Sequence, residues 1–85
     1  MNYTYAIWSQ LKNKTPDDLV RCLLKDGWKK DITKGAKQIY RHPESRRRVS
    51  IHYHPNKTYG ASLLKGLLND IGWSVEEMRK LKLIK

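Results

Sequence analysis

The chain has 85 residues and a mass of 10.1 kDa, so it has room for one small domain with a single core. A hydrophobic fraction of 39% fits a folded domain, and the single cysteine, Cys22, excludes an internal disulfide framework and a cysteine-built zinc site. The formal net charge of +10 favours a polyanionic partner such as nucleic acid. Because neither a long apolar run nor a signal-peptide start is present, we expect a cytoplasmic protein without a membrane span.

Two helices are predicted before the first strand. A short helix over residues 4–12 would carry Tyr5, Ile7, Trp8 and Leu11. A second helix over 16–26 has Thr15 as a candidate N-cap, Pro16 at the first helical position and Gly27 as its stop. Its apolar stripe is predicted to consist of Leu19, Val20, Leu23 and Leu24.

Three strands follow, separated by short turns. Residues 28–33 and 36–42 predict two strands joined by a turn at Lys34-Gly35. Residues 48–54 form the clearest strand, because Val49, Ile51 and Tyr53 alternate with polar residues. Short connections of this kind predict an antiparallel meander.

Two further helices complete the chain. Residues 61–70 carry an apolar stripe closed by Gly72, and residues 75–81 follow Ser74, a candidate N-cap with Glu77 at the third position. The stripe consists of Leu64, Leu67, Leu68 and Ile71. The fold class is therefore α+β: a helix, a three-stranded antiparallel sheet and a helix, with short extra helical ends.

The alternation assigns a different character to each face of the sheet. Tyr40 would pack against the helices together with Val49, Ile51 and Tyr53. The open face would combine basic and histidine side chains, namely Lys37, Ile39, Arg41, Ser50, His52 and His54. Residues 29–57 hold nine basic and two acidic residues, a net +7, against +3 for the rest of the chain. This clustering points to the sheet region as the polyanion-binding surface.

These segments together resemble the HicA (YcfA-like) toxin family, the small ribonuclease half of HicA–HicB toxin–antitoxin systems. The resemblance is carried by Leu24 through Gly27-Trp28 and by three motifs in family order: KGAKQIYRHP at 34–43, RRVSIHYHPNK at 47–57 and SLLKGLLNDIGW at 62–73. It divides the chain into an N-terminal extension (1–14), a HicA-like domain (15–73) and a short C-terminal helix and tail (74–85).

The resemblance implies a fold like that of double-stranded-RNA-binding domains, cleavage of mRNA without the ribosome, and neutralisation by a HicB-like antitoxin. It departs from the family at one important position. The family usually reads Gly-Ser-His where this chain has Gly35-Ala36-Lys37, so Lys37 occupies the position of the family's catalytic histidine. The family's activity therefore does not carry over directly.

The residues themselves also suit RNA cleavage without a metal. The 2′-hydroxyl of RNA can attack the adjacent phosphate when a base, an acid and nearby cations assist, and histidine is the natural proton carrier. His52 and His54 would project from one face, about 6.5–7 Å apart along the strand. We therefore predict His54, His52 and Lys37 as catalytic residues, with Arg41 helping to neutralise the phosphate.

A wider set of basic residues is predicted to contact RNA without reading its sequence, namely Lys34, Lys37, Arg41, Arg46, Arg47, Arg48, Lys57 and Lys65. No metal or organic cofactor is expected, because His52 and His54 lack an obvious third ligand nearby. The plainer interpretations are a packed thiol for Cys22 and a turn residue for His42.

Two alternatives to a nuclease stay open. The first is a non-catalytic RNA-binding module that has kept the fold and charge, and the second is a protein-interaction domain whose basic face binds only an acidic partner. Cleavage in EDTA separates the nuclease from both, and salt-dependent RNA binding separates the two alternatives from each other.

Overall fold

The computed structural model describes residues 3–52 and 58–85. Its elements in chain order are α1 (Tyr5–Leu11), α2 (Pro16–Lys25), β1 (Lys29–Lys34), β2 (Lys37–Arg41), β3 (Arg48–His52), α3 (Ala61–Ile71) and α4 (Val75–Lys80). The strands form one antiparallel sheet in the order β1-β2-β3. The predicted α+β class is confirmed: in chain order, a helix, a three-stranded antiparallel meander and a helix, with further helices at both ends.

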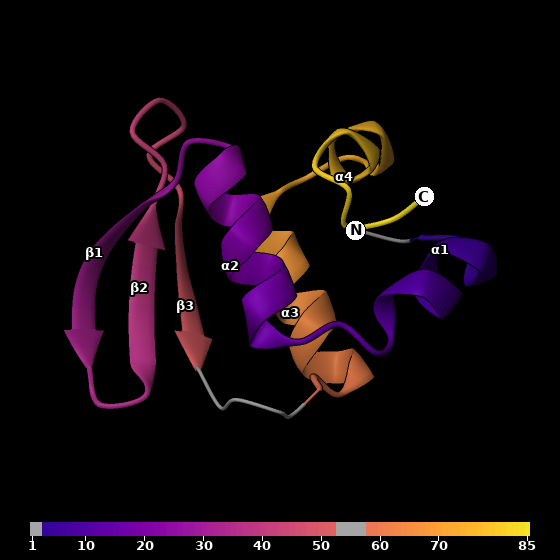
Figure 1. The fold of residues 1–85 in the computed structure, drawn as a ribbon, viewed down its shortest axis with the longest axis horizontal. Helices are drawn as coiled ribbons and strands as arrows, with labels where there is room; N and C mark the ends of the chain where they lie inside the picture. The colour runs from indigo at the N-terminus through magenta and orange to yellow at the C-terminus, as the bar shows by residue number, and fades with distance from the viewer. Residues whose placement is uncertain (1–2, 53–57) are drawn as a thin grey trace.

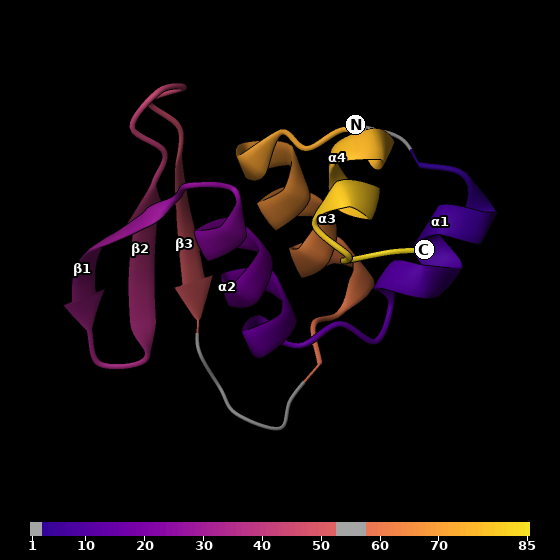
Figure 2. The same ribbon diagram turned by 45° about the horizontal axis from the view of Figure 1, so that its top comes forward.

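The sheet lies at one end of the molecule. Figure 1 shows α2 and α3 beside the sheet on the side of β3, and α1 and α4 at the opposite end. The turned view in Figure 2 agrees, and it shows the C-terminus reaching α1. The long axis measures 34 Å, so the two ends present separate surfaces.

Helix α2 begins as its sequence predicts. The Thr15 hydroxyl accepts a hydrogen bond from the Asp18 backbone N–H at 3.3 Å, and the Asp18 carboxylate accepts one from the Thr15 N–H at 3.0 Å. Pro16 opens the helix, where its missing N–H costs nothing. After the helix, Gly27 takes a φ of +92°, a conformation that favours glycine.

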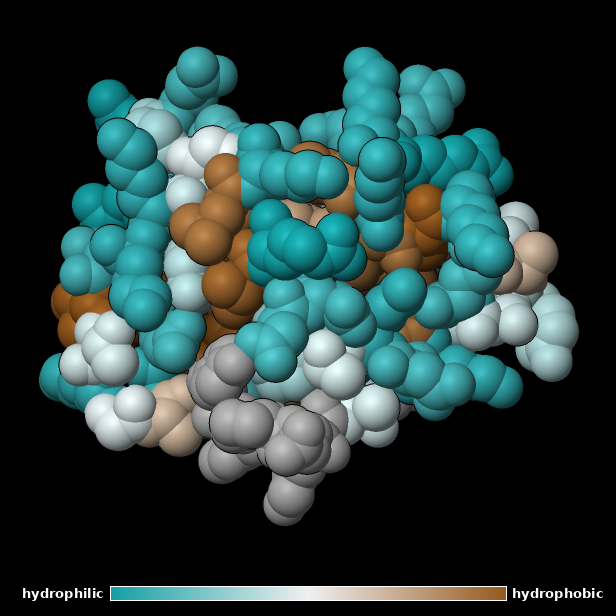
Figure 3. Space-filling view, viewed as in Figure 1, coloured by the Kyte–Doolittle hydropathy of each residue, from teal (hydrophilic) through white to brown (hydrophobic). Residues whose placement is uncertain are grey.

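The predicted apolar stripe of α2 is wrong at one edge. Leu19 and Leu23 are buried as predicted, but Leu24 is 56% exposed, and Cys22 is buried in its place. The physical reason is a second packing surface formed by the C-terminal tail, where the Cys22 thiol donates to the Leu81 carbonyl at 3.4 Å. Contact with this tail shifts the centre of the buried face toward Cys22. Figure 3 shows hydrophobic surface in the middle of the molecule, over α2.

The core face of the sheet matches the alternation. Tyr40, Val49 and Ile51 are each at most 2% exposed, and α3 packs against β3. The predicted stripe of α3 is confirmed, because Leu64, Leu67, Leu68 and Ile71 are all buried. Strand β1 differs: every one of its residues is exposed, so it is an edge strand that no helix covers.

Both chain ends join the same core. Ile7 and Leu11 from α1 are buried with Met78 from α4 and with Leu83 from the tail. The Asp26 carboxylate accepts hydrogen bonds from the indole N–H of Trp73 at 2.8 Å and of Trp28 at 3.1 Å. No helix in the described part of the chain is both long and apolar enough to cross a membrane.

Candidate nucleic-acid interface

The open face of the sheet consists of three rows of side chains that run across the strands. Residues paired across an antiparallel sheet point to the same face, so the strand register defines these rows. They are Lys34–Lys37–His52, then Ile32–Ile39–Ser50, then Lys29–Arg41–Arg48. Two rows carrying basic side chains therefore flank a largely apolar one.

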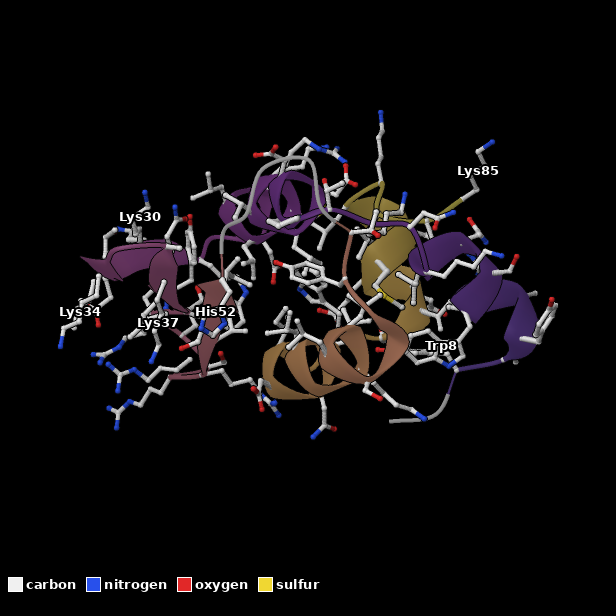
Figure 4. The ribbon with its side chains drawn as sticks, turned by 90° about the horizontal axis from the view of Figure 1, so that it is seen from below. Trp8, Lys30, Lys34, Lys37, His52 and Lys85 are labelled. Atoms are coloured by element: carbon white, nitrogen blue, oxygen red, sulfur yellow. The ribbon has the colours of Figure 1, made fainter. Side chains whose placement is uncertain are left out.

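The first row lies beside the β1–β2 turn, and we call Lys34, Lys37 and His52 the cationic row. Lys37 pairs with Lys34 on β1 and with His52 on β3, and all three residues are exposed. Side chains paired in this way have Cβ atoms about 4.5–5.5 Å apart. Figure 4 shows the three labelled side chains gathered at the sheet end of the molecule. The row thus places the His52 imidazole beside the ammonium group of Lys37, with Lys34 one strand further on.

The third row is partly neutralised by an aspartate that sequence reasoning left outside the site. Asp31 Oδ2 lies 3.4 Å from the guanidinium of Arg41 and 3.5 Å from that of Arg48. The pairing of β1 with β2 is irregular between Lys30 and Ile32, and Asp31 sits at that irregularity. Two arginines directly opposite each other repel, so the carboxylate relieves this repulsion. The irregularity arises from the pairing of two strands, so the local sequence around Asp31 could not predict it.

A hollow of about 510 Å³ opens at the Arg41 end of the strands. Arg41, Arg46 and Arg48 line it together with His42 and Pro43. Arg46 adopts a φ of +59°, in the left-handed region that most side chains avoid. The structure therefore holds a cation at a turn position where glycine would be free of strain.

Arg47 points away from this hollow. Its guanidinium donates to the Asp70 carbonyl at 3.4 Å, close to the end of α3. A side chain at Gly72 would begin 2.8 Å from Nη1 of Arg47, and the φ of +81° there also favours glycine. Arg47 therefore caps a helix C-terminus, where a cation is favourable, and it separates from its two neighbours in sequence.

His42 is a structural residue of the turn, in line with the plainer interpretation. Its Nδ1 accepts from the backbone N–H groups of Glu44 and Ser45, each at 3.2 Å. Its Nε2 therefore carries the proton and donates to the Asp26 carbonyl at 3.0 Å. The ring also meets Trp28 edge-on at 5.5 Å between centroids. With both nitrogens engaged, His42 is held in one tautomer.

One further predicted residue, Lys65, lies away from these rows. Lys65 sits with its ammonium 5.8 Å from the centre of the Trp8 ring, on the side of the molecule that carries α1. His54 and Lys57 fall outside the described residues, as does Tyr53, whose predicted place in the core stays a prediction. Cys22 is a packed thiol as interpreted, since it is completely buried and desolvation raises its pKa.

The comparison with known families agrees with this arrangement. Residues 16–73, about two thirds of the chain, match the family described as HicA toxin of bacterial toxin–antitoxin. The matched region contains α2, the whole sheet and α3. A search of curated proteins found no match. The chain belongs to the HicA toxin family of bacterial toxin–antitoxin systems.

Proposed function

We propose that this toxin is a metal-independent endoribonuclease that binds and cuts mRNA in the cytoplasm. One observation carries the proposal: His52 lies directly opposite Lys37, the residue that stands where the family has its catalytic histidine. The imidazole is thereby one strand away from the usual position, on the same open face. A proton carrier and cations are the two things that RNA cleavage without a metal requires.

The proposed chemistry is attack by the RNA 2′-oxygen on the adjacent phosphorus. A base removes the 2′-hydroxyl proton, the P–O bond to the 5′-oxygen breaks, and an acid protonates that leaving oxygen. His52, with His54 as the second proton carrier, would perform these transfers. Lys37 and Arg41 would neutralise the charge that develops on the phosphate oxygens.

RNA contact would extend from the cationic row to the hollow lined by Arg41, Arg46 and Arg48. Lys37 and Arg41 are four residues apart on β2, a separation of about 13 Å along the strand. Phosphate contacts at both ends would position the strand over the row without reading its bases. Affinity should then fall steeply with salt, because each phosphate contact releases counterions.

A HicB-like antitoxin would act by covering the same face. A partner with acidic side chains complements the two basic rows and would displace RNA by occupying them. In a competition assay, the antitoxin and RNA should exclude one another. A ternary complex that leaves His52 accessible would contradict occlusion.

The replacement of the family's histidine by Lys37 favours a second candidate function, a non-catalytic RNA-binding module. Cleavage by the purified wild type in EDTA, compared with Lys37→His, distinguishes the two. Activity of the wild type supports the nuclease. A wild type that does not cleave RNA, together with a Lys37→His variant that does, would identify a binding module that has lost its proton carrier.

A further inference from the structure

A second basic surface lies at the end of the molecule opposite the sheet. It is a hollow of about 790 Å³ formed where α1, α4 and the C-terminal tail meet, and we call it the tail hollow. Its polar lining consists of Gln10, Lys14, Arg79, Lys82 and Lys85. Figure 4 shows labelled Lys85 far from Lys34, Lys37 and His52. Every one of these lining residues falls outside the family-matched region of 16–73.

The tail hollow contains four basic residues and no acidic one. None of the ion pairs formed between side chains in residues 3–52 and 58–85 involves one of these four residues, whereas Arg41 and Arg48 in the sheet share Asp31. The Gln10 side chain accepts from the Lys85 N–H at 2.7 Å, and Arg79 Nε donates to a main-chain oxygen of Lys85 at 3.2 Å. These bonds tie the tail to α1 and α4, so the hollow is a built feature of the fold.

Lys82 provides an independent observation. It follows the C-cap of α4 with a φ of +62°, and the N–H groups of Lys82 and Leu83 close the helix by donating to Arg79 and Met78. This geometry is the helix ending that normally uses glycine. A side chain at such a position strains the backbone, and strain of this kind concentrates at functional sites. The fold thus tolerates strain to hold an ammonium group at the tail hollow.

The lining favours phosphate groups over a protein partner. Leu83 is completely buried and Ile84 is 5% exposed, so the apolar surface that lines the tail hollow belongs chiefly to the carbon stems of its long polar side chains, and it offers no pocket for an apolar anchor. A stable protein interface needs an apolar core with anchoring side chains. Backbone phosphates need only cations, and lysines bind them as point charges.

We propose that the tail hollow is a second binding site for RNA phosphates, separate from the cationic row. It would hold a part of the RNA strand remote from the cleavage site and so add affinity without adding sequence preference. The inference rests on the proposed function only in taking RNA as the ligand. It requires neither cleavage nor any residue of the sheet.

The test compares two double variants with the same net charge. Lys14→Gln with Lys82→Gln removes two cations of the tail hollow, and Lys12→Gln with Lys80→Gln removes two exposed lysines from the same segments outside it. Both lower the formal charge from +10 to +8. The probe is a single-stranded 2′-O-methyl RNA of about 16 nucleotides, which cannot be cut by 2′-oxygen attack.

The slope of log Kd against log salt should fall by roughly 1 to 2 in the tail-hollow variant relative to its control, since each lost phosphate contact contributes about 0.7. Lys82→Gly provides a second test, because it should raise Tm by a few degrees, about 4 °C, while weakening RNA binding. Equal slopes in the two double variants would overturn the inference, as would unchanged binding by Lys82→Gly.

Failure of the inference can be told from failure of the proposed function. If the wild type binds this RNA and Lys34→Gln with Lys37→Gln weakens binding, but the tail-hollow variant behaves as its control, only the tail hollow is wrong. If the wild type shows no salt-dependent RNA binding, both proposals fall.

Discussion

Lys37 and His52 are direct partners across the β2–β3 pair, on the face of the sheet that the helices leave open. Lys37 stands at the position of the family's usual histidine, and His52 is its neighbour on the adjacent strand. In the proposed function, His52 thereby supplies a proton carrier one strand away from the position of the family's histidine.

Arg46→Gly should stabilise the protein and weaken its binding to RNA. The change removes the strain of a side chain at φ +59°, which is worth about 1 kcal/mol, and it also removes one cation from the 510 Å³ hollow. Thermal unfolding and RNA titrations at several salt concentrations measure the two effects. Unchanged RNA affinity in a more stable variant would exclude Arg46 from the interface.

Asp31→Asn should strengthen RNA binding. The variant releases Arg41 and Arg48 from their shared carboxylate, so the salt dependence should become steeper. Stability should change by less than about 1 kcal/mol, because these ion pairs are solvent-exposed. Glu44→Gln makes the same change of charge outside the rows and serves as the control. Weaker binding by Asp31→Asn would mean that Asp31 orients the arginines toward phosphate.

Tyr59→Phe should leave the protein equally stable or more stable at neutral pH. The Tyr59 hydroxyl is buried and has no hydrogen-bond partner among the described residues, so its removal takes away an unpaired polar group. Tyr5→Phe is the control, because Tyr5 is 87% exposed. A clear loss of stability would reveal a hydrogen bond made by this hydroxyl.

The same variant should also change the response to alkali. Burial, with a further contribution from Asp17, raises the pKa of Tyr59 to about 12 from an ordinary value of 10.0. The folded state therefore keeps the proton longer than the unfolded state, and stability falls as pH rises from about 10 to about 12, by up to ~1.4 kcal/mol per pH unit. Denaturant unfolding across this range should show a shallower fall in Tyr59→Phe. An identical fall in wild type and variant would contradict the assignment.

Asp26→Ala should destabilise the fold substantially. The Asp26 carboxylate satisfies the indole N–H groups of Trp28 and Trp73, and Trp73 is 1% exposed. A buried donor left without a partner costs about 1–3 kcal/mol. Chemical denaturation measures this cost, with Asp70→Ala at an exposed position as the control. Equal stability of the two variants would show that Asp26 is dispensable.

Local sequence signals predicted the elements well where a single segment determines the outcome. The Thr15-Pro16 start of α2, the alternation of β3 and the glycine stops at Gly27 and Gly72 depend on short-range chemistry. Once the meander was assumed, the alternation also predicted that Lys37 and His52 share the open face, whereas their direct pairing comes from the strand register of the structure.

Features that depend on distant contacts could not be predicted in this way. Leu24 is exposed because the buried face of α2 is centred nearer Cys22, whose thiol bonds to the Leu81 carbonyl 59 residues further along the chain. Asp31 joins the site through an irregular pairing of β1 with β2. The tail hollow forms from two ends of the chain, with Gln10 and Lys85 joined across 75 residues. Each depends on tertiary packing, for which the sequence carries no local signal.

The central claim is that His52, beside Lys37, transfers protons during RNA cleavage. The most direct measurement is the cleavage rate of RNA in EDTA by wild type and His52→Gln, with thermal unfolding as the folding control. Glutamine keeps a polar side chain but cannot carry a proton near neutral pH, so cleavage should fall about 10²–10⁴-fold while RNA binding and Tm stay close to wild type. Cleavage at the wild-type rate by a folded His52→Gln protein would contradict the account.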